Sequence, residues 1–188
     1  MGVVESCCIM AAGGSSLVIN SLVIESLVRA KQEDYSVKNT IRLKRPSGDT
    51  IDEVHPGIFI SGKRPSRDLT ALQRYNITTI ISVAAGIRPR YPEKFRYLVV
   101  DVEDKPETDI VTSSAEALGL LAECQGKGEA VLVHCHAGVS RSVSVVCLYL
   151  MQNHGMAFFE ALSRVKERRP RADPNVGFRM QLAKLDKK

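Results

Sequence analysis

The stretch "EAVLVHCHAGVSRSVSVVCLYLMQNHG" (residues 129–155) decides the fold of this chain. Its first seven residues, "EAVLVHC", form an apolar run of strand length. Residues 142–155, "SVSVVCLYLMQNHG", are mostly apolar over the length of a helix that Gly155 can end. A short loop, "HAGVSR" (136–141), joins the two segments. The stretch therefore predicts a buried strand that leads into a buried helix through a tight loop.

This loop has the features of an anion-binding site. At the start of a helix, several backbone N–H groups lack partners and point to one place, with the helix dipole behind them. We expect this environment to favour the thiolate of Cys135, to lower its pKa and to make it a nucleophile. The planar guanidinium of Arg141 can bind two oxygens of a phosphate at once. The six N–H groups that would surround the anion belong to His136, Ala137, Gly138, Val139, Ser140 and Arg141.

Two other interpretations of the loop are weaker. A zinc site is disfavoured because the side chains of His134 and His136 fall on one side of an extended chain and Cys135 on the other. The remaining histidines, His55 and His154, form no second cluster of metal ligands. A buried core thiol does not explain why a glycine, two serines and an arginine occur together at the start of a helix. We therefore expect no metal and no cofactor.

The chain from residue 50 onward alternates between strand and helix patterns. This alternation predicts an α/β layered fold with a largely parallel central sheet. Strands are expected at 57–62, 77–84, 95–102 and 129–135, and helices at 66–76 with Ser66 as the cap, 108–128, 142–155, 157–170 and 174–186.

The N-terminal part of the chain has a different character. Residues 16–30 are three tandem units, "SLVIN", "SLVIE" and "SLVRA". A polar stripe at i, i+4 spacing favours a helix there, whereas the abundance of Val and Ile favours a strand, and both remain open. "RPSGD" (45–49) is typical of a linker. With 188 residues in total, we expect an N-terminal segment at 1–49 and one domain at 50–188.

Composition and charge exclude several classes of protein. The apolar content of 44% and charged content of 25% are those of a soluble globular protein, and the apolar runs end before membrane-spanning length. The net charge is +5, and Lys and Arg cluster at 88–96 and 164–171. Such clusters are most often solvated faces, but they also suit anionic substrates or an anionic membrane surface. No nucleic-acid-binding signature accompanies them, so nucleic acid is not an expected partner.

"HCHAGVSRS" (134–142) resembles the H-C-x5-R-S signature loop of the cysteine-dependent phosphatases, and its A-G-V-S-R-S part is most similar to the dual-specificity branch, particularly its small atypical members. The resemblance covers residues 50–186. It implies a three-layer α/β fold with a mostly parallel four- to five-stranded sheet, and hydrolysis of phosphomonoesters through a phosphocysteine. The other similar stretches are "HPGIFISG" (55–62), "LQRYNITTIISVA" (72–84), "YLM" (149–151), "ALSRVKERRP" (161–170) and "PNVGFRMQL" (174–182).

The resemblance also implies roles for the loop residues. Cys135 would be the nucleophile, and Arg141 would bind the phosphoryl group together with the loop N–H groups. His134 would lie behind the thiolate, and Ser142 would offer its hydroxyl to the sulfur. His136 occupies a variable position, and we expect a residue at the rim without a chemical role.

The leaving oxygen needs a proton from a carboxylic acid on another loop. The family pattern D-x-P-x-x-D-I aligns with Asp104, Pro106, Asp109 and Ile110, which makes Asp104 the candidate acid. Asp101 is the alternative, and either carboxylate could instead be a solvated loop charge.

Proteins carrying phosphotyrosine and phosphoserine or phosphothreonine are the expected substrates, and a monomer is the expected state. A lipid-directed relative would carry lysines inside the loop, where this chain has His136, Val139 and Ser140, and an RNA triphosphatase would end the loop in N-R-T. Two alternatives stay open: a catalytically weak phosphopeptide-binding module, and a phosphatase for a non-protein phosphomonoester.

The first residues, "MGVVESCC" (1–8), fit the myristoylation pattern M-G-x-x-x-S. Gly2 would carry the myristoyl group, and Cys7 and Cys8 would carry palmitoyl groups. One acyl chain gives marginal membrane binding and two give stable anchoring, so we expect a peripheral protein at the cytoplasmic membrane face. An ordinary tail with ordinary thiols is the alternative.

The chain has five cysteines, an odd number, and their spacing is not that of a disulfide framework. No secretory leader is recognised. These features predict thiols in a reducing compartment. The family resemblance allows a reversible disulfide that protects Cys135, but we expect Cys124 and Cys147 to be ordinary thiols.

Overall fold

The computed structural model describes residues 50–186. The expectations for the repeat at 16–30, the linker at 45–49 and the acylation sites Gly2, Cys7 and Cys8 lie outside these residues. None of the helices in the described part of the chain has the length and apolar character needed to cross a membrane.

The core of the domain is a five-stranded sheet in the order β1-β2-β5-β3-β4. β1 is antiparallel to β2, and the other neighbours are parallel, so the predicted mostly parallel α/β fold is confirmed. The sequence did not predict β1, which is short and turns into β2 through Gly57 at φ 73°. The strands are β1 Asp52–His55, β2 Ile58–Ser61, β3 Ile77–Val83, β4 Arg96–Val100 and β5 Ala130–His134.

Two of the predicted helices differ from the structure in more than their end residues. The segment expected as one helix at 66–76 begins with a 3-10 turn that starts at Pro65, so Ser66 is not the cap. Asp68 caps α2 instead, by accepting from the N–H of Ala71. The segment expected at 108–128 is two helices, with a break at Ser114. The helices are α2 Leu69–Arg74, α3 Ile110–Ser113, α4 Ala115–Gly126, α5 Arg141–His154, α6 Phe158–Arg168 and α7 Val176–Leu185.

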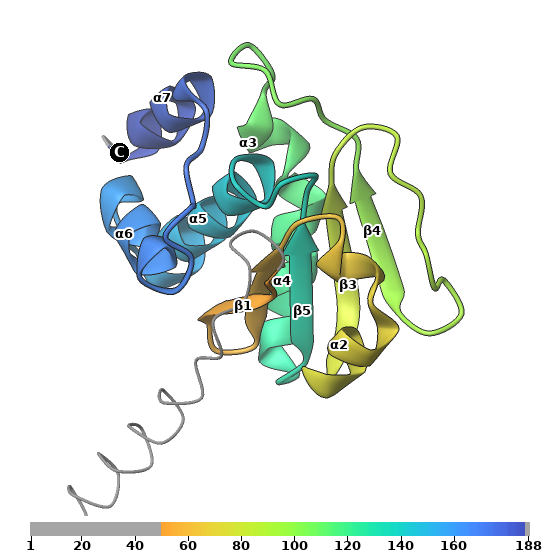
Figure 1. The fold of residues 1–188 in the computed structure, drawn as a ribbon. Helices are drawn as coiled ribbons and strands as arrows, with labels where there is room; N and C mark the ends of the chain where they lie inside the picture. The colour runs from red at the N-terminus through yellow and green to blue at the C-terminus, as the bar shows by residue number, and fades with distance from the viewer. Residues whose placement is uncertain (1–49, 187–188) are drawn as a thin grey trace, which may run out of the picture. The chain divides into compact units, whose positions relative to one another are not determined.

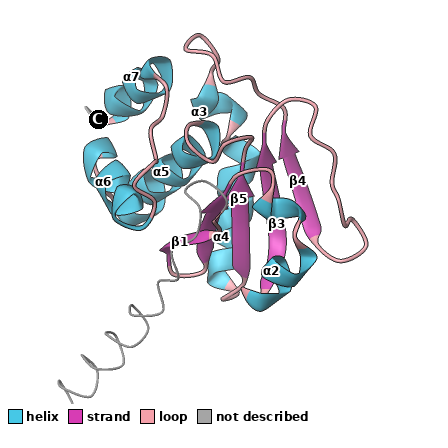
Figure 2. Ribbon diagram, in the orientation of Figure 1, coloured by secondary structure: helices cyan, strands magenta, loops and turns pink. Residues whose placement is uncertain are grey.

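The two faces of the sheet bury different helices (Figures 1 and 2). Successive strand residues point to opposite faces. Leu132 of β5 packs in a smaller cluster with Leu72 of α2, whereas Val131 and Val133 pack in the main core with α4, α5 and α6. α5 is buried from Arg141 to Met151, which fits its mostly apolar sequence. The sheet thus lies between two helical layers.

This topology brings the Cys135 loop and the acidic segment after β4 together at the carboxyl ends of the parallel strands. β5 lies between β2 and β3, ends at His134, and leads through the loop 135–140 into α5. β4 is parallel to β3, so its carboxyl end, with the acidic segment that follows, opens at the same edge. In open α/β sheets, ligands bind outside the carboxyl ends of the strands.

Candidate active site

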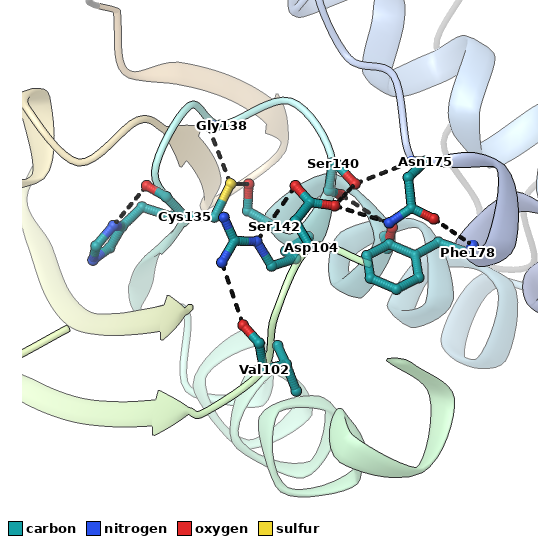
Figure 3. Close-up of polar contacts among 11 residues, drawn as sticks. Val102, Asp104, Cys135, Gly138, Ser140, Ser142, Asn175 and Phe178 are labelled. Carbon is teal, nitrogen blue, oxygen red and sulfur yellow. Dashed lines mark hydrogen bonds and ion pairs between the residues drawn. The ribbon is translucent and has the colours of Figure 1, made fainter. Parts of the chain in front are cut away.

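The loop between β5 and α5 wraps around the sulfur of Cys135 (Figure 3). Gly138 makes this path possible because its φ is 65°, in the left-handed region that favours glycine. A Cβ at this position would lie 2.5 Å from the backbone oxygen of Ser61 and 2.5 Å from Nη2 of Arg169. Both the turn and the close approach therefore require glycine.

The Cys135 sulfur is buried and accepts hydrogen bonds from its own loop. The Gly138 N–H donates to Sγ at 3.1 Å, and the Ser142 hydroxyl donates at 3.3 Å. Burial is the largest influence on the thiol and acts to raise its pKa. The Ser142 hydroxyl and the N–H groups of Ser142, Val139 and Gly138 outweigh burial, and the pKa of Cys135 is lowered. A thiol held in this way is suited to act as a nucleophile.

His134 lies at the end of β5, on the sheet side of the cysteine. Its Nδ1 is 3.4 Å from the Cys135 carbonyl oxygen, and its Nε2 is 2.8 Å from the Ser82 hydroxyl on the neighbouring strand β3. Burial lowers the pKa of His134 to about 4, so the ring is neutral at pH 7. Because a carbonyl oxygen only accepts, the ring proton belongs on Nδ1 and Nε2 accepts from Ser82. His134 thus fixes the backbone at Cys135.

His136 is exposed, whereas Arg141 is buried with its side chain turned toward the loop that follows β4. Nη1 of Arg141 donates to the Val102 carbonyl oxygen at 3.3 Å, and Nε of Arg141 lies 3.5 Å from Oδ2 of Asp104. Within the described residues this buried Nε has no hydrogen-bond partner. The guanidinium therefore retains donor capacity for an oxyanion bound in the loop.

Asp104 lies over the loop, and its two carboxylate oxygens have different surroundings. Oδ1 accepts from the Ser140 hydroxyl at 2.7 Å and from Nδ2 of Asn175 at 2.9 Å (Figure 3). Oδ2 faces Arg141 instead, and the side chain is 34% exposed. Asp101 is also exposed, whereas the side chain of Asp104 contacts Ser140 and Arg141. Oδ1 is thus held by two hydrogen bonds, while Oδ2 has the looser ion-pair contact with Arg141.

Arg169 supports the loop from behind. This arginine is fully buried, and its Nε donates to the Gly138 carbonyl oxygen at 2.6 Å while Nη2 donates to that of Ala137 at 3.4 Å. Its counter-charge is Asp52 on β1, at 2.5 Å from Nη1. Because the loop carbonyls are bound on this side, the adjoining N–H groups are directed toward the sulfur.

Sequence reasoning did not identify four of these supporting residues. Ser82 is the penultimate residue of the buried strand β3, where a polar side chain is a usable signal. Asn175 precedes a helix and could have been recognised as its cap. Arg169 lies in the basic cluster at 164–171, for which a solvated face, an anionic substrate and a membrane surface are the expectations from sequence. Asp52 lies in β1, which the sequence does not predict. The contacts of the last two join residues 117 apart in the chain, and no local pattern reports them.

The other cysteines in the described residues are buried and free. Sγ of Cys124 lies 3.6 Å from the Thr79 hydroxyl, and burial raises the pKa of Cys124. Burial raises the pKa of Cys147 to about 12. Residues 50–186 contain no group of three or more His, Cys, Asp or Glu placed to hold a metal ion.

A low-pKa thiol that accepts hydrogen bonds from its own loop, with an arginine and a carboxylate beside it, is typical of a cysteine-dependent phosphatase. Comparisons with known proteins agree. Residues 58–188 match the family model described as "Dual specificity phosphatase, catalytic domain". The chain therefore belongs to the dual-specificity phosphatase family.

Three relatives illustrate this similarity. The chain is 40% identical over 134 residues to dual specificity protein phosphatase 1 of Arabidopsis thaliana. The aligned residues cover 71% of this chain and 68% of that relative. The crystal structure of DUSP15 is 34% identical with a TM-score of 0.70 and covers 74% of this chain and 88% of that chain. A human "tyrosine phosphatase-like serine/threonine/tyrosine-interacting protein" is 33% identical with a TM-score of 0.69, covering 73% and 95%.

These relationships establish the general activity. The protein is a cysteine-dependent dual-specificity protein phosphatase, and its substrates are phosphoproteins.

Proposed function

We propose that Cys135 hydrolyses phosphotyrosine and phosphoserine or phosphothreonine in proteins through a phosphocysteine. The observation that carries the proposal is the Cys135 sulfur, which accepts from the Gly138 N–H and the Ser142 hydroxyl and has a lowered pKa. The thiolate attacks phosphorus, and the bond from phosphorus to the substrate oxygen breaks. The loop N–H groups and Arg141 stabilise the charge on the equatorial oxygens in the transition state.

Asp104 acts as the general acid in the first step. Its Oδ2, which is not engaged by Ser140 or Asn175, donates a proton to the leaving oxygen of the substrate. In the second step Asp104 accepts a proton from the attacking water, inorganic phosphate forms, and the thiolate of Cys135 leaves. The Ser142 hydroxyl bonds to the sulfur and stabilises the charge that returns to it.

The test uses the purified full chain and three phosphopeptides that differ only in carrying phosphotyrosine, phosphothreonine or phosphoserine. We expect phosphate release from all three, and no release with Cys135→Ser. Release that persists in Cys135→Ser would refute the mechanism. Phosphoinositide vesicles serve as the comparison, and faster release from lipid than from every peptide would favour the non-protein substrate.

A phosphopeptide-binding module is the second candidate, and one observation favours it. A structural relative is described as a tyrosine phosphatase-like interacting protein. This description suggests that the fold can also serve binding. The two candidates differ in turnover. Binding of the phosphopeptides without phosphate release by the wild-type chain would support the module and exclude the enzyme mechanism proposed above.

We also propose that the protein is tethered to the cytoplasmic face of a membrane by a myristoyl group on Gly2 and palmitoyl groups on Cys7 and Cys8. The support is the pattern "MGVVESCC" and the physical need for two acyl chains. Gly2→Ala should move the protein to the soluble fraction of a cell lysate, and Cys7→Ser with Cys8→Ser should weaken membrane binding. Unchanged membrane association of Gly2→Ala would refute acylation as the anchor.

A further inference from the structure

The segment from Asp104 to Ile110, here called the acid loop, lies against one helix. α7 reaches the acid loop near α3, at the same end of the domain (Figure 1). Gln181 of α7 uses both ends of its side-chain amide on the loop backbone. Its Nε2 donates to the Thr108 carbonyl oxygen at 2.8 Å, and its Oε1 accepts from the Ile110 N–H at 3.1 Å. A side chain with only a donor or only an acceptor could not make both bonds.

Gly177 brings α7 into direct backbone contact with the acid loop. A Cβ built at Gly177 would lie 1.9 Å from the Pro106 carbonyl oxygen and 2.4 Å from its Cα. Because these atoms are backbone, they cannot move away as a flexible side chain would. Any residue other than glycine at this position would displace either the loop or the helix.

The contacts run in the same order along both segments. Asn175, which caps α7, donates to Asp104, Gly177 meets Pro106, and Gln181 binds the backbone beyond it. Positions 177 and 181 are four residues apart and lie on one face of a helix. Val176 and Met180 of the same helix are 62% and 56% exposed. The face toward the acid loop is therefore distinct from the exposed face.

We propose that α7 is the template that sets the position of the general acid, and that Gly177 and Gln181 are positioning residues for the reaction. The proposal rests on the role of Asp104 given above. Neither residue touches the Cys135 loop in the contacts described, so both act through the acid loop. General acids contribute about 10²- to 10⁴-fold to such reactions, and a displacement of about 1 Å can cost about 10²-fold.

The experiment compares leaving groups in the full chain. Gly177→Ala is tested with p-nitrophenyl phosphate, whose leaving group needs little protonation, and with phenyl phosphate, whose leaving group needs it. We expect a loss of about 10²-fold in kcat/KM, which reports the step that expels the leaving group, with phenyl phosphate and a much smaller loss in kcat/KM with p-nitrophenyl phosphate. Gly119→Ala is the matched control, because nothing lies within 4 Å of a Cβ at that helical glycine.

A second variant keeps the test decisive if Gly177→Ala does not fold. Gln181→Leu removes both hydrogen bonds at similar volume and should show the same dependence on the leaving group, to a smaller extent. The rate at which iodoacetamide alkylates Cys135 should be unchanged in both variants, since the thiolate is not involved. An equal loss with both substrates, no loss, or a changed alkylation rate would overturn the proposal.

Asp104→Asn separates this proposal from the one on which it rests. If Asp104→Asn shows no dependence on the leaving group, the assignment of the acid fails. If Asp104→Asn shows the dependence but Gly177→Ala and Gln181→Leu do not, the acid stands and the template role of α7 fails.

Discussion

Removal of the negative charge of Asp52, which pairs with the buried Arg169, is expected to destabilise this domain strongly. Asp52→Asn keeps the size of the side chain and one acceptor oxygen but removes the negative charge. Arg169 is fully buried and would then be an uncompensated cation. Burial already lowers the pKa of Arg169, and Asp52 is the first group that opposes this effect.

The size of the effect follows from the geometry. Removal of one partner from a buried ion pair costs about 3–5 kcal/mol. The Asp52 side chain is 23% exposed and the asparagine oxygen can still accept, so we expect about 2–3 kcal/mol. For a domain of this size, that loss corresponds to a decrease in Tm of roughly 10 °C.

Urea unfolding followed by circular dichroism measures the free energy of unfolding, and a thermal scan gives the Tm. Asp173→Asn is the matched control, because Asp173 also pairs with an arginine, Arg179, but is 55% exposed. Exposed pairs contribute about 0–1 kcal/mol. If Asp52→Asn and Asp173→Asn destabilise the protein equally, the reasoning about the buried pair is wrong.

Three further predictions concern the residues around the sulfur. The rate of alkylation of Cys135, followed peptide by peptide in a mass spectrometer, should titrate with a midpoint below the ordinary pKa of 9.0. Ser142→Ala should raise that midpoint by about one pH unit, the equivalent of one hydrogen bond to a charged group, and no change would exclude the hydroxyl as a donor. The pKa of His134 falls from 6.5 to about 4 on folding. Between these pH values the unfolded chain binds a proton at His134 that the folded chain does not bind. The free energy of unfolding should therefore decrease as the pH falls through this interval, by at most about 3 kcal/mol. Unfolding measured from pH 7 to pH 4 should show a weaker dependence for His134→Gln, and identical profiles would contradict the assignment. Gly138→Ala should abolish phosphate release, because the Cβ would meet backbone atoms at 2.5 Å and 2.6 Å. Gly155→Ala, with the same φ of 65° but open space around it, should cost about 1 kcal/mol of stability and leave activity intact.

The parts of the structure that could be predicted are those set by local patterns. The apolar run before His134 has the length of a strand and the apolar run after Arg141 has the length of a helix, and together they fix the strand, the loop and the helix. The cap of α2 shows the limit of such patterns. Ser66 and Asp68 are both good caps, and the choice between them depends on the 3-10 turn that Pro65 starts.

The support of the site could not be predicted, because it depends on contacts between segments far apart in the chain. Asn175 and Asp104 are 71 residues apart, and the Ser82 hydroxyl meets His134 across two strands whose register becomes known only when the sheet is assembled. The sequence contained these polar residues, but their partners were not indicated by spacing or composition.

One connecting segment supports both halves of the site. Residues 169–175, between α6 and α7, follow the Cys135 loop almost residue by residue. Arg169 donates to the carbonyl of Gly138, and the Asp173 N–H donates to that of Val139 at 2.8 Å. The Asn175 N–H then donates to the Ser140 hydroxyl at 3.0 Å.

The same segment also reaches the acid, since Asn175 donates to Asp104 through its side chain while its backbone holds Ser140. The positions of the Cys135 loop and of Asp104 are therefore coupled through this segment. Pro170 and Pro174 fix φ at two points of this connection, which reduces the number of conformations it must give up on folding. A chain that keeps "HCHAGVSRS" intact but loses the geometry of 169–175 would keep its cysteine and arginine and still lose the alignment that turnover requires.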